Sequence, residues 1–446
     1  MRDLLLPIET SKALALDRSR ELAARARRVI PGSSQTLSKG PTQYVQGASP
    51  VFLERGSGAR VVDVDGNEYI DYPGALGPVV LGYSYPAVNR AIARQLEDGI
   101  TFSLMHPLEV ELAELLSARL AGARGEMGMV RFAKNGSDVT AAAVRLARAL
   151  TGRELVARSG YHGSQDWFLA STSRAAGVPR ALRELVRRFE YNDLDSLGRI
   201  FSEAGPPVAA VILEPLQSDG PTPGFLEGVV ELAHRYGALV IFDEIKSGFR
   251  LAMGGAGEYF GVRPDLACYG KAIANGMPLA ALVGPRELMR GFDQGGVFFS
   301  MTFGGEALSL AAAVATIREL ESQPVFEHLW RQGDRLKAGF NGLAARAGLG
   351  QVVRCLGPEP KSAVVFEPAG PYSPLALKSL FQQEVIRRGV LFNGDHMLSY
   401  SHTAADIDRT LEVYEQALEA LASHLGDETV LEAIDGTLLE AVFREI

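Results

Sequence analysis

Val208-Ala-Ala-Val-Ile-Leu213 and Ala238-Leu-Val-Ile-Phe-Asp243-Glu244 are two apolar runs with carboxylates at or just beyond their C-terminal ends. Their β-branched residues predict two buried strands. Between them, residues Leu226 to Tyr236 carry apolar side chains at helical spacing. A strand, a helix and a second strand in this order predict a right-handed crossover unit within a parallel sheet.

The same alternation of helical patterns and short strands extends from about Pro86 to Gln323. It is typical of a mostly parallel sheet covered by helices. Before it, helical spacing from Thr10 to Ile30 predicts a helix that ends at Pro31-Gly32, and Arg60 to Asp71 predicts a hairpin around an Asp-Gly turn.

The stretch from about Pro324 predicts a long helix, short strands near Val352 and Val364, a helix around Leu377 to Arg388 and a last helix from Asp406. We therefore expect an α/β fold in three parts. Residues 86–323 form a large domain, and the segments 1–85 and 324–446 build a smaller α+β domain.

Composition limits the ligands of this 446-residue chain, whose net charge is −8. An acidic protein has no electrostatic reason to bind nucleic acid or an anionic membrane. Its two cysteines, Cys268 and Cys355, form no metal-ligand pattern, and no apolar run is long enough for a transmembrane helix or a signal peptide. We expect a cytoplasmic protein without a metal that acts on a small molecule.

Two residues near predicted strand ends are candidates for catalysis. Asp243 stands at the sheet edge where open α/β sheets bind ligands, although a carboxylate there can also cap a turn. Lys271, in Asp265-Leu-Ala-Cys-Tyr-Gly-Lys271-Ala, is confined by small and apolar neighbours. Confinement favours a nucleophilic amine, and a snorkelling lysine at a loop edge is the alternative.

Two turns resemble anion sites. Asn135-Gly136-Ser137-Asp138 opens an alanine-rich helix, so that free amides and a hydroxyl face a ligand there. Serine and aspartate are also common helix caps. A second turn, Phe299-Ser-Met-Thr302, precedes another alanine-rich helix and taken alone is a plain loop. Neither is a Walker loop, because no GxxxxGK[ST] occurs.

Ser159-Gly-Tyr161-His162-Gly163 places an aromatic ring and an imidazole between glycines. Tyr161 is able to stack on a flat ligand there, although a packed loop aromatic is the more frequent fate of a tyrosine. A dinucleotide site is not indicated, since Gly254-Gly-Ala-Gly257 lacks the GxGxxG spacing and a preceding strand.

These five segments, in this order and spacing, resemble the class III aminotransferases of pyridoxal-phosphate fold type I, and most closely the glutamate-1-semialdehyde 2,1-aminomutase branch. The resemblance covers nearly the whole chain, from Arg28-Val-Ile-Pro-Gly32 to Ser401-His-Thr-Ala-Ala-Asp-Ile-Asp408. It implies a PLP enzyme that transfers an amino group.

The resemblance also assigns roles to residues. Lys271 matches the lysine that binds pyridoxal 5′-phosphate as an aldimine, and Asp243 matches the acid on its ring nitrogen. Gly136 and Ser137 match the positions that bind the phosphate. Tyr161 matches the aromatic residue that stacks on the ring, and Ile245 the residue on the opposite face. The other cofactor-binding positions are His162, Glu214 as a residue that helps to order the site, and Thr302 as a phosphate ligand across a dimer interface. A homodimer with shared active sites follows.

Two departures concern the substrate. Leu76 stands where the aminomutase branch tends to have tryptophan, and Lys39 stands where it carries a carboxylate-binding arginine. We therefore expect ping-pong transfer from an amino donor to a small carbonyl acceptor, with pyridoxamine 5′-phosphate as the intermediate cofactor form. The alternatives are an aminomutase and a non-catalytic PLP-binding protein, the latter disfavoured by the full residue set.

Overall fold

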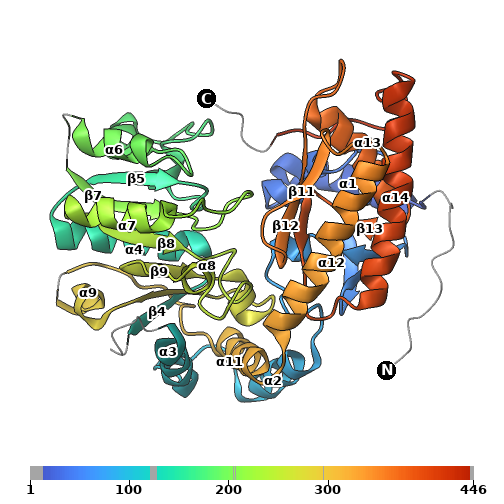
Figure 1. The fold of residues 1–446 in the computed structure, drawn as a ribbon. Helices are drawn as coiled ribbons and strands as arrows, with labels where there is room; N and C mark the ends of the chain where they lie inside the picture. The colour runs from blue at the N-terminus through green and yellow to red at the C-terminus, as the bar shows by residue number, and fades with distance from the viewer. Residues whose placement is uncertain (1–13, 121–127, 204, 206, 295, 442–446) are drawn as a thin grey trace. The chain divides into compact units, whose positions relative to one another are not determined.

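The computed structural model describes residues 14–120, 128–203, 205, 207–294 and 296–441, and Figure 1 traces them. Among these residues the chain forms two compact units. The larger unit contains 77–80 and 85–327, and the smaller contains 14–76, 81–84 and 328–441. The three-part domain division expected from sequence stays a prediction.

A seven-stranded sheet of order β4-β10-β9-β8-β7-β5-β6 forms the centre of the larger unit (Figure 1). Its strands are β4 (Met129–Ala133), β5 (Leu155–Ser159), β6 (Val186–Arg188), β7 (Val208–Leu213), β8 (Leu239–Asp243), β9 (Leu266–Tyr269) and β10 (Ala280–Gly284). The pairs from β9 to β6 are parallel, and β10 runs antiparallel to both its neighbours. The predicted strand-helix-strand unit is confirmed as β7, α7 (Phe225–Arg235) and β8.

Both faces of this sheet are covered because alternate side chains of a strand point to opposite sides. On β7, Val211 and Leu213 join one buried cluster with α6 (Leu194–Ser202) and α7. Ala210 and Ile212 join another cluster with α4 (Gly136–Thr151). The continuous apolar runs of the sequence reflect this double burial.

The larger unit has further helices around the sheet. These are α2 (Pro86–Asp98), α3 (Pro107–Leu120), α5 (Asp166–Leu169), α8 (Ala256–Phe260), α9 (Arg286–Met289), α10 (Gly291–Gln294) and α11 (Ala307–Ser322), with 3₁₀ turns at Arg180–Leu185 and Lys271–Ala274. The strands β8 and β9 thus deliver their C-terminal ends to loops that are free of long helices.

The smaller unit joins the two ends of the chain. Its sheet β1-β2-β3-β13 consists of β1 (Leu53–Ser57), β2 (Arg60–Asp63), β3 (Glu68–Asp71) and β13 (Val390–Leu391). β13 pairs in parallel with β3, so that a C-terminal strand completes an N-terminal sheet. The predicted hairpin is confirmed as β2 and β3, which pair antiparallel.

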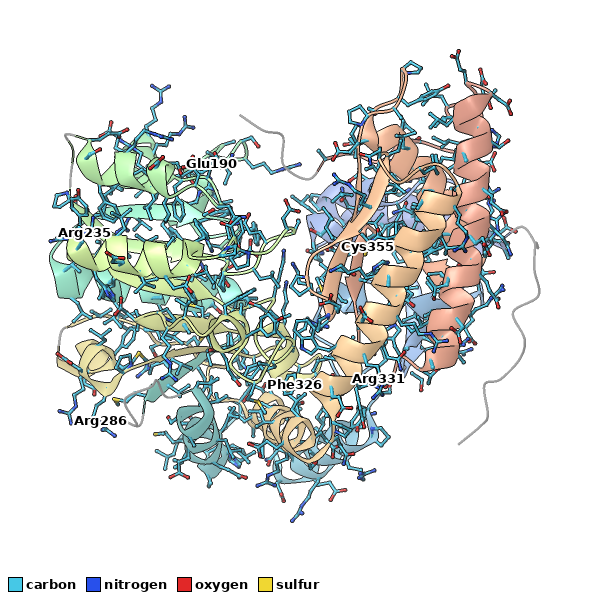
Figure 2. The ribbon with its side chains drawn as sticks, in the orientation of Figure 1. Glu190, Arg235, Arg286, Phe326, Arg331 and Cys355 are labelled. Carbon is cyan, nitrogen blue, oxygen red and sulfur yellow. The ribbon has the colours of Figure 1, made fainter. Side chains whose placement is uncertain are left out.

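A second sheet of order β11-β12-β14 and four long helices complete the smaller unit. The elements are β11 (Val353–Leu356), β12 (Lys361–Phe366), β14 (Asp395–Met397), α1 (Asp17–Val29), α13 (Pro374–Ile386), α14 (Ala404–Gly426) and α12 (Val325–Arg346), which begins in the larger unit. Cys355 is buried on β11 (Figure 2). The expected α/β architecture with a largely parallel central sheet is confirmed.

Candidate active site

Lys271 lies on a tight turn directly after β9. It begins the 3₁₀ turn Lys271–Ala274 and adopts a left-handed backbone conformation with φ +44°. Such a conformation costs a non-glycine residue about 1–3 kcal/mol and persists where the surrounding structure fixes it. The next three residues, Ala272 to Ala274, are buried and anchor the turn. Lys271 itself is half-buried.

Asp243 ends β8 and forms a buried pair with His162. The Oδ2 atom lies 2.8 Å from His162 Nδ1, and both side chains are almost fully inaccessible to solvent. The second carboxylate oxygen, Oδ1, accepts the Ile245 backbone N–H at 3.2 Å. The structure therefore brings together Asp243, His162 and Ile245, three of the predicted cofactor residues.

The hydrogen bonds of His162 fix the proton content of this pair. Nε2 lies 3.2 Å from the Ser159 carbonyl oxygen, which only accepts, so Nε2 carries a proton. The contact between Nδ1 and Asp243 Oδ2 is a hydrogen bond whose proton either atom can carry. Both buried polar groups are therefore satisfied, which lowers the free-energy cost of their burial.

Two aromatic side chains absent from the sequence prediction hold His162 in place. Trp167 stacks on the imidazole with 6.2 Å between ring centroids, and Phe168 contacts it edge-on at 5.6 Å. Both are buried on α5. Asp166 opens this short helix, and the following aromatic pair was the only sequence signal for these positions.

Asp243 and Lys271 leave the same edge of the sheet on neighbouring strands. Asp243 is paired in register with Cys268 of β9, three positions before Lys271. The next residue, Glu244, donates its backbone N–H to the Cys268 carbonyl at 2.9 Å. Burial, followed by the charge of Asp243, raises the pKa of the Cys268 thiol, which therefore stays protonated.

The start of α4 has the geometry of an anion site. Asn135 and Asp138 cap each other's backbone amides, which leaves the amides of Gly136 and Ser137 at the helix start. Ser137 Oγ accepts the Ser164 backbone N–H at 3.0 Å, and the two hydroxyls are 3.4 Å apart. Ser164 is a second hydroxyl at this site that the sequence prediction missed.

Gly163 allows this close approach. Its φ is +105°, and a Cβ there would lie 2.3 Å from Ser137 Oγ and 2.8 Å from Ser137 Cα. Ile245 fills the neighbouring space, since a Cβ on Gly136 or Gly270 would lie within 3.1 Å or 2.9 Å of its Cδ1. Glycines therefore shape both sides of the candidate site.

Tyr161 and Glu214 form a further part of the site. Tyr161 is 46% exposed, and its ring contacts Phe168 edge-on at 5.3 Å between centroids. Its backbone N–H donates to Glu214 Oε2 at 2.9 Å, and Glu214 Oε1 lies 3.5 Å from Lys246 Nζ. Glu214, which follows β7, thus fixes the loop that presents Tyr161.

The remaining predicted residues lie elsewhere. Thr302 is exposed on a turn before α11. Lys39, at the end of the 3₁₀ turn Leu37–Lys39, and Leu76, with φ +72°, belong to the smaller unit. Burial raises the pKa of Asp71 there to about 6, an effect that the Tyr83 hydroxyl and the nearby Lys39 oppose.

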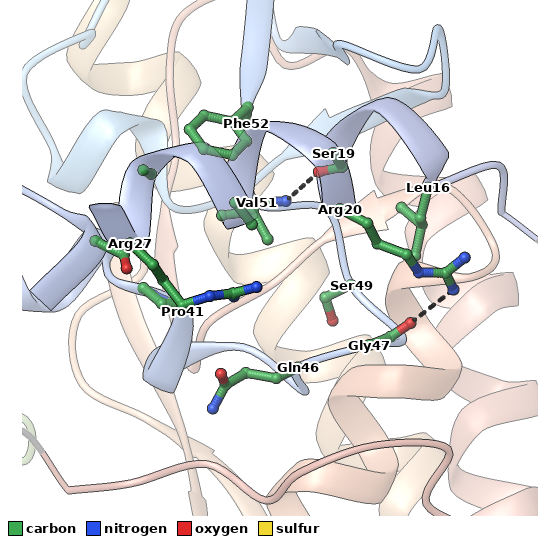
Figure 3. A pocket seen from close by; sticks show the side chains of 13 residues that line it. Leu16, Ser19, Arg20, Arg27, Pro41, Gln46, Gly47, Ser49, Val51 and Phe52 are labelled. Carbon is green, nitrogen blue, oxygen red and sulfur yellow. Dashed lines mark hydrogen bonds between the residues drawn. The ribbon is translucent and has the colours of Figure 1, made fainter. Parts of the chain in front are cut away.

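Other features of the described residues do not point to a different site. A cavity of about 140 Å³ lies between α1 and residues 33–52 (Figure 3), and none of the candidate residues lines it. Among the residues that the structure describes, no group of three or more His, Cys, Asp or Glu side chains is arranged to bind a metal. Within the same residues, every helix is too short or too polar for a bilayer.

The fold is that of the PLP fold type I transaminases. The family described as Aminotransferase class-III matches residues 43–361. The chain therefore belongs to the class III aminotransferases and is an enzyme, as the resemblance predicted.

Relatives at similar distance differ in reaction. A 3-aminobutyryl-CoA aminotransferase of Cloacimonas acidaminovorans (strain Evry) is 36% identical and aligns with 92% of this chain and 98% of its own. A glutamate-1-semialdehyde 2,1-aminomutase of Desulforudis audaxviator (strain MP104C) is 37% identical, with 90% and 97% aligned.

Solved structures agree with this assignment. The FumI protein of Sphingopyxis sp. MTA144, in its PLP internal aldimine form, has a TM-score of 0.83 at 30% identity and covers 92% of this chain and 97% of its own. An omega-transaminase from Sphaerobacter thermophilus has a TM-score of 0.80 at 28% identity, with coverage of 90% and 97%.

Proposed function

We propose that this aminotransferase binds pyridoxal 5′-phosphate at Lys271 and transfers an amino group from a small amino donor to a small carbonyl acceptor. The observation that carries the proposal is the buried pair of Asp243 and His162 beside the strained turn of Lys271. A non-catalytic protein would not need a buried acid and a lysine on a strained turn at the same edge of the sheet.

The residues at the start of α4 fit the phosphate of this cofactor. Two backbone amides and the hydroxyls of Ser137 and Ser164 supply donors, and the partial positive charge of the helix start favours an anion. Gly163 keeps the space next to Ser137 free of a side chain. The donor set contains no carboxylate other than Asp138, which is occupied by the Asn135 amide.

The side chains near Asp243 fit the cofactor's ring. Asp243 supplies a carboxylate for the ring nitrogen, and His162 stabilises its charged form by a hydrogen bond. Ile245 and the exposed face of Tyr161 are apolar surfaces for the two sides of a flat ring. Glu214 holds the Tyr161 loop through the backbone amide.

Bound PLP supplies an electron-accepting ring that stabilises the substrate carbanion. With PLP bound, Lys271 would supply the amine that holds the cofactor's aldehyde, and its Nζ would accept and return the substrate's α-proton. Asp243 would hold the ring nitrogen of the cofactor through its carboxyl group, which His162 and the Ile245 backbone amide keep in place by hydrogen bonds.

We also propose a cytoplasmic homodimer. Large apolar side chains are exposed on two segments of the larger unit, Phe102 to Met105 and Phe298 to Phe303. Leu104 is 86% exposed and Phe298 74%. The second segment contains Thr302, so a partner subunit seated here would receive its hydroxyl, as the shared-site hypothesis requires.

Lys271→Ala tests the proposal. We expect the variant to lose the visible absorbance of the bound cofactor and roughly 10³-fold or more in turnover, since alanine has no amine to hold the cofactor's aldehyde. Lys337→Ala is the control, because Lys337 pairs with Glu359 in the smaller unit. Full turnover by Lys271→Ala would contradict the proposal.

An aminomutase is the second candidate, favoured by the 37% identity to a relative with that name. Turnover of one substrate that carries both amine and carbonyl, after loading with pyridoxamine 5′-phosphate and without added donor, would support it. Strict dependence on a second carbonyl substrate would exclude it. Lys39→Arg with Leu76→Trp should increase any single-substrate turnover, since these changes restore the residues that the branch carries.

A further inference from the structure

Four residues of the N-terminal part of the chain, Gly77–Val80, belong to the larger unit. The residues before and after them, up to Leu76 and from Leu81 to Ser84, belong to the smaller unit. Leu76 is a predicted substrate residue held in a left-handed conformation. Whatever fixes Gly77 therefore also limits where Leu76 lies.

Arg250 contacts this segment directly. Its guanidinium is 1% exposed and donates from Nη2 to the Gly77 carbonyl oxygen at 2.8 Å. Burial lowers the pKa of this guanidinium to about 10, so the group stays charged at neutral pH. A charged donor to a backbone carbonyl inside the protein is a strong and directional hydrogen bond.

The loop that carries Arg250 is fixed in turn by Glu244. The Glu244 carboxyl is 1% exposed and accepts hydrogen bonds from the Ser247 hydroxyl and from the backbone amides of Ala256, at 2.9 Å, and Gly257, at 2.7 Å. Gly255 has φ +78°, and a Cβ there would lie 2.2 Å from Glu244 Oε2. No larger residue fits beneath this carboxyl.

These contacts form a continuous path that starts at the acid of the candidate site. Glu244 follows Asp243 in sequence and closes the loop from Ser247 to Gly257. Phe249 adopts φ +58° in this loop, which turns the chain immediately before Arg250. The end of β8 thereby fixes both the candidate cofactor acid and the guanidinium on Gly77.

We propose that Arg250 is a positioning residue that anchors Gly77–Val80 and so sets the place of the substrate-side residue Leu76, with Glu244 holding the Arg250 loop. This inference rests on the proposed function, because it needs Leu76 to face substrate. Arg250 itself touches neither cofactor nor substrate in this proposal, and acts through the Gly77 carbonyl.

The test uses Arg250→Met, which keeps the length and apolar stem but has no donor, in the full-length holoenzyme. Loss of one charged hydrogen bond should raise KM for the amino donor roughly 10- to 100-fold and change kcat by less than about threefold. Hydrogen exchange of amides in residues 76–84 should accelerate by at least about tenfold. The visible absorbance of the bound cofactor should stay unchanged.

Arg153→Met is the matched control. Arg153 also donates to two backbone carbonyls, those of Val208 at 3.0 Å and Tyr236 at 2.7 Å, but at the far end of the strands. We expect it to leave KM and the exchange of residues 76–84 unchanged. Arg250→Lys keeps the positive charge and has one donor group. Its KM and its exchange rates in residues 76–84 should lie between those of Arg250→Met and of the wild type.

Wild-type KM and unchanged exchange in folded Arg250→Met would overturn the positioning role. If neither Arg250 variant folds while Arg153→Met does, Arg250 serves stability alone and the proposal is also overturned. Failure of the proposed function is distinguishable from failure of the positioning role. In the first case the wild-type protein itself would show no cofactor absorbance. In the second case the wild type would show it, and the exchange measurement, which requires no substrate, would give the same rates for Arg250→Met and the wild type.

Discussion

Gly163→Ala gives the sharpest test of the phosphate site. The new Cβ would overlap Ser137 Oγ at 2.3 Å and the Ser137 backbone at 2.8 Å, so Ser137 has to move. This overlap costs about 1–3 kcal/mol, as overpacking does elsewhere. A further 1–3 kcal/mol, roughly, comes from placing alanine at φ +105°.

Gly177→Ala separates the two contributions. Gly177 has a comparable φ of +84°, but a Cβ there would point into open space, with no atom within 4 Å. Gly177→Ala should therefore lose only the stability that the positive φ costs an alanine, without the cost of overlap. The difference between the two variants in free energy of unfolding therefore measures the cost of displacing Ser137. This displacement also breaks the 3.0 Å hydrogen bond from the Ser164 backbone amide to Ser137 Oγ.

Urea unfolding and equilibrium titration with PLP, followed by absorbance, provide the two readouts. Gly163→Ala should unfold with roughly 1–3 kcal/mol less stability than Gly177→Ala and bind PLP about 5- to 150-fold more weakly. Gly177→Ala should keep wild-type PLP affinity. Wild-type affinity in folded Gly163→Ala would refute the placement of the phosphate beside Ser137.

Three further predictions use other residues. Ser164→Ala should weaken PLP binding about 2- to 10-fold in the same titration, as expected for one hydroxyl donor, and no change would remove Ser164 from the phosphate site. Burial raises the Glu244 pKa from 4.5 to about 7, so between these pH values the folded state keeps a proton that the unfolded chain releases. The free energy of unfolding should therefore fall by roughly 3 kcal/mol as the pH rises from 4.5 to 7. Urea unfolding of Glu244→Gln should lack this fall. Burial lowers the His396 pKa from 6.5 to about 3, so the unfolded chain binds a proton at a higher pH than the folded state does. The free energy of unfolding should therefore fall by roughly 5 kcal/mol as the pH drops from 6.5 to 3. His396→Gln should lose stability less steeply with acid, and an equal loss in variant and wild type would contradict the buried neutral imidazole.

The local sequence predicted the elements that depend on local patterns. The apolar runs at 208–213 and 238–242 became β7 and β8, and the helix between them ends one residue before its predicted limit. The pairing of β10 with β4 joins residues about 150 positions apart, and nothing in either strand's pattern encodes its antiparallel direction. The same holds for β13, which pairs with β3 from the other end of the chain.

The candidate site shows the same limit. Asp243 and Lys271 were recognisable because each stands in a short, distinctive segment, but the bond between His162 and Asp243 spans 81 positions. Ser164 carried no signal of its own, since a serine after a glycine occurs in many loops, and Trp167 was marked only by the aromatic pair that it forms with Phe168. The glycines at 160 and 163 were the usable clue, because their positive φ values permit the approach of Glu214 and Ser137.

The contacts around β8 explain why cofactor residues were easier to infer than substrate residues. Asp243 needs only a strand end and one imidazole, and both come from the larger unit. Leu76 is the last residue before the chain enters the larger unit at Gly77, whose carbonyl oxygen accepts a hydrogen bond from a guanidinium 173 residues away. If Arg250 sets the place of Leu76 as we propose, a substitution in the Arg250 loop alters KM for the amino donor while Lys271, Asp243 and the turn at Gly136 and Ser137 remain the same.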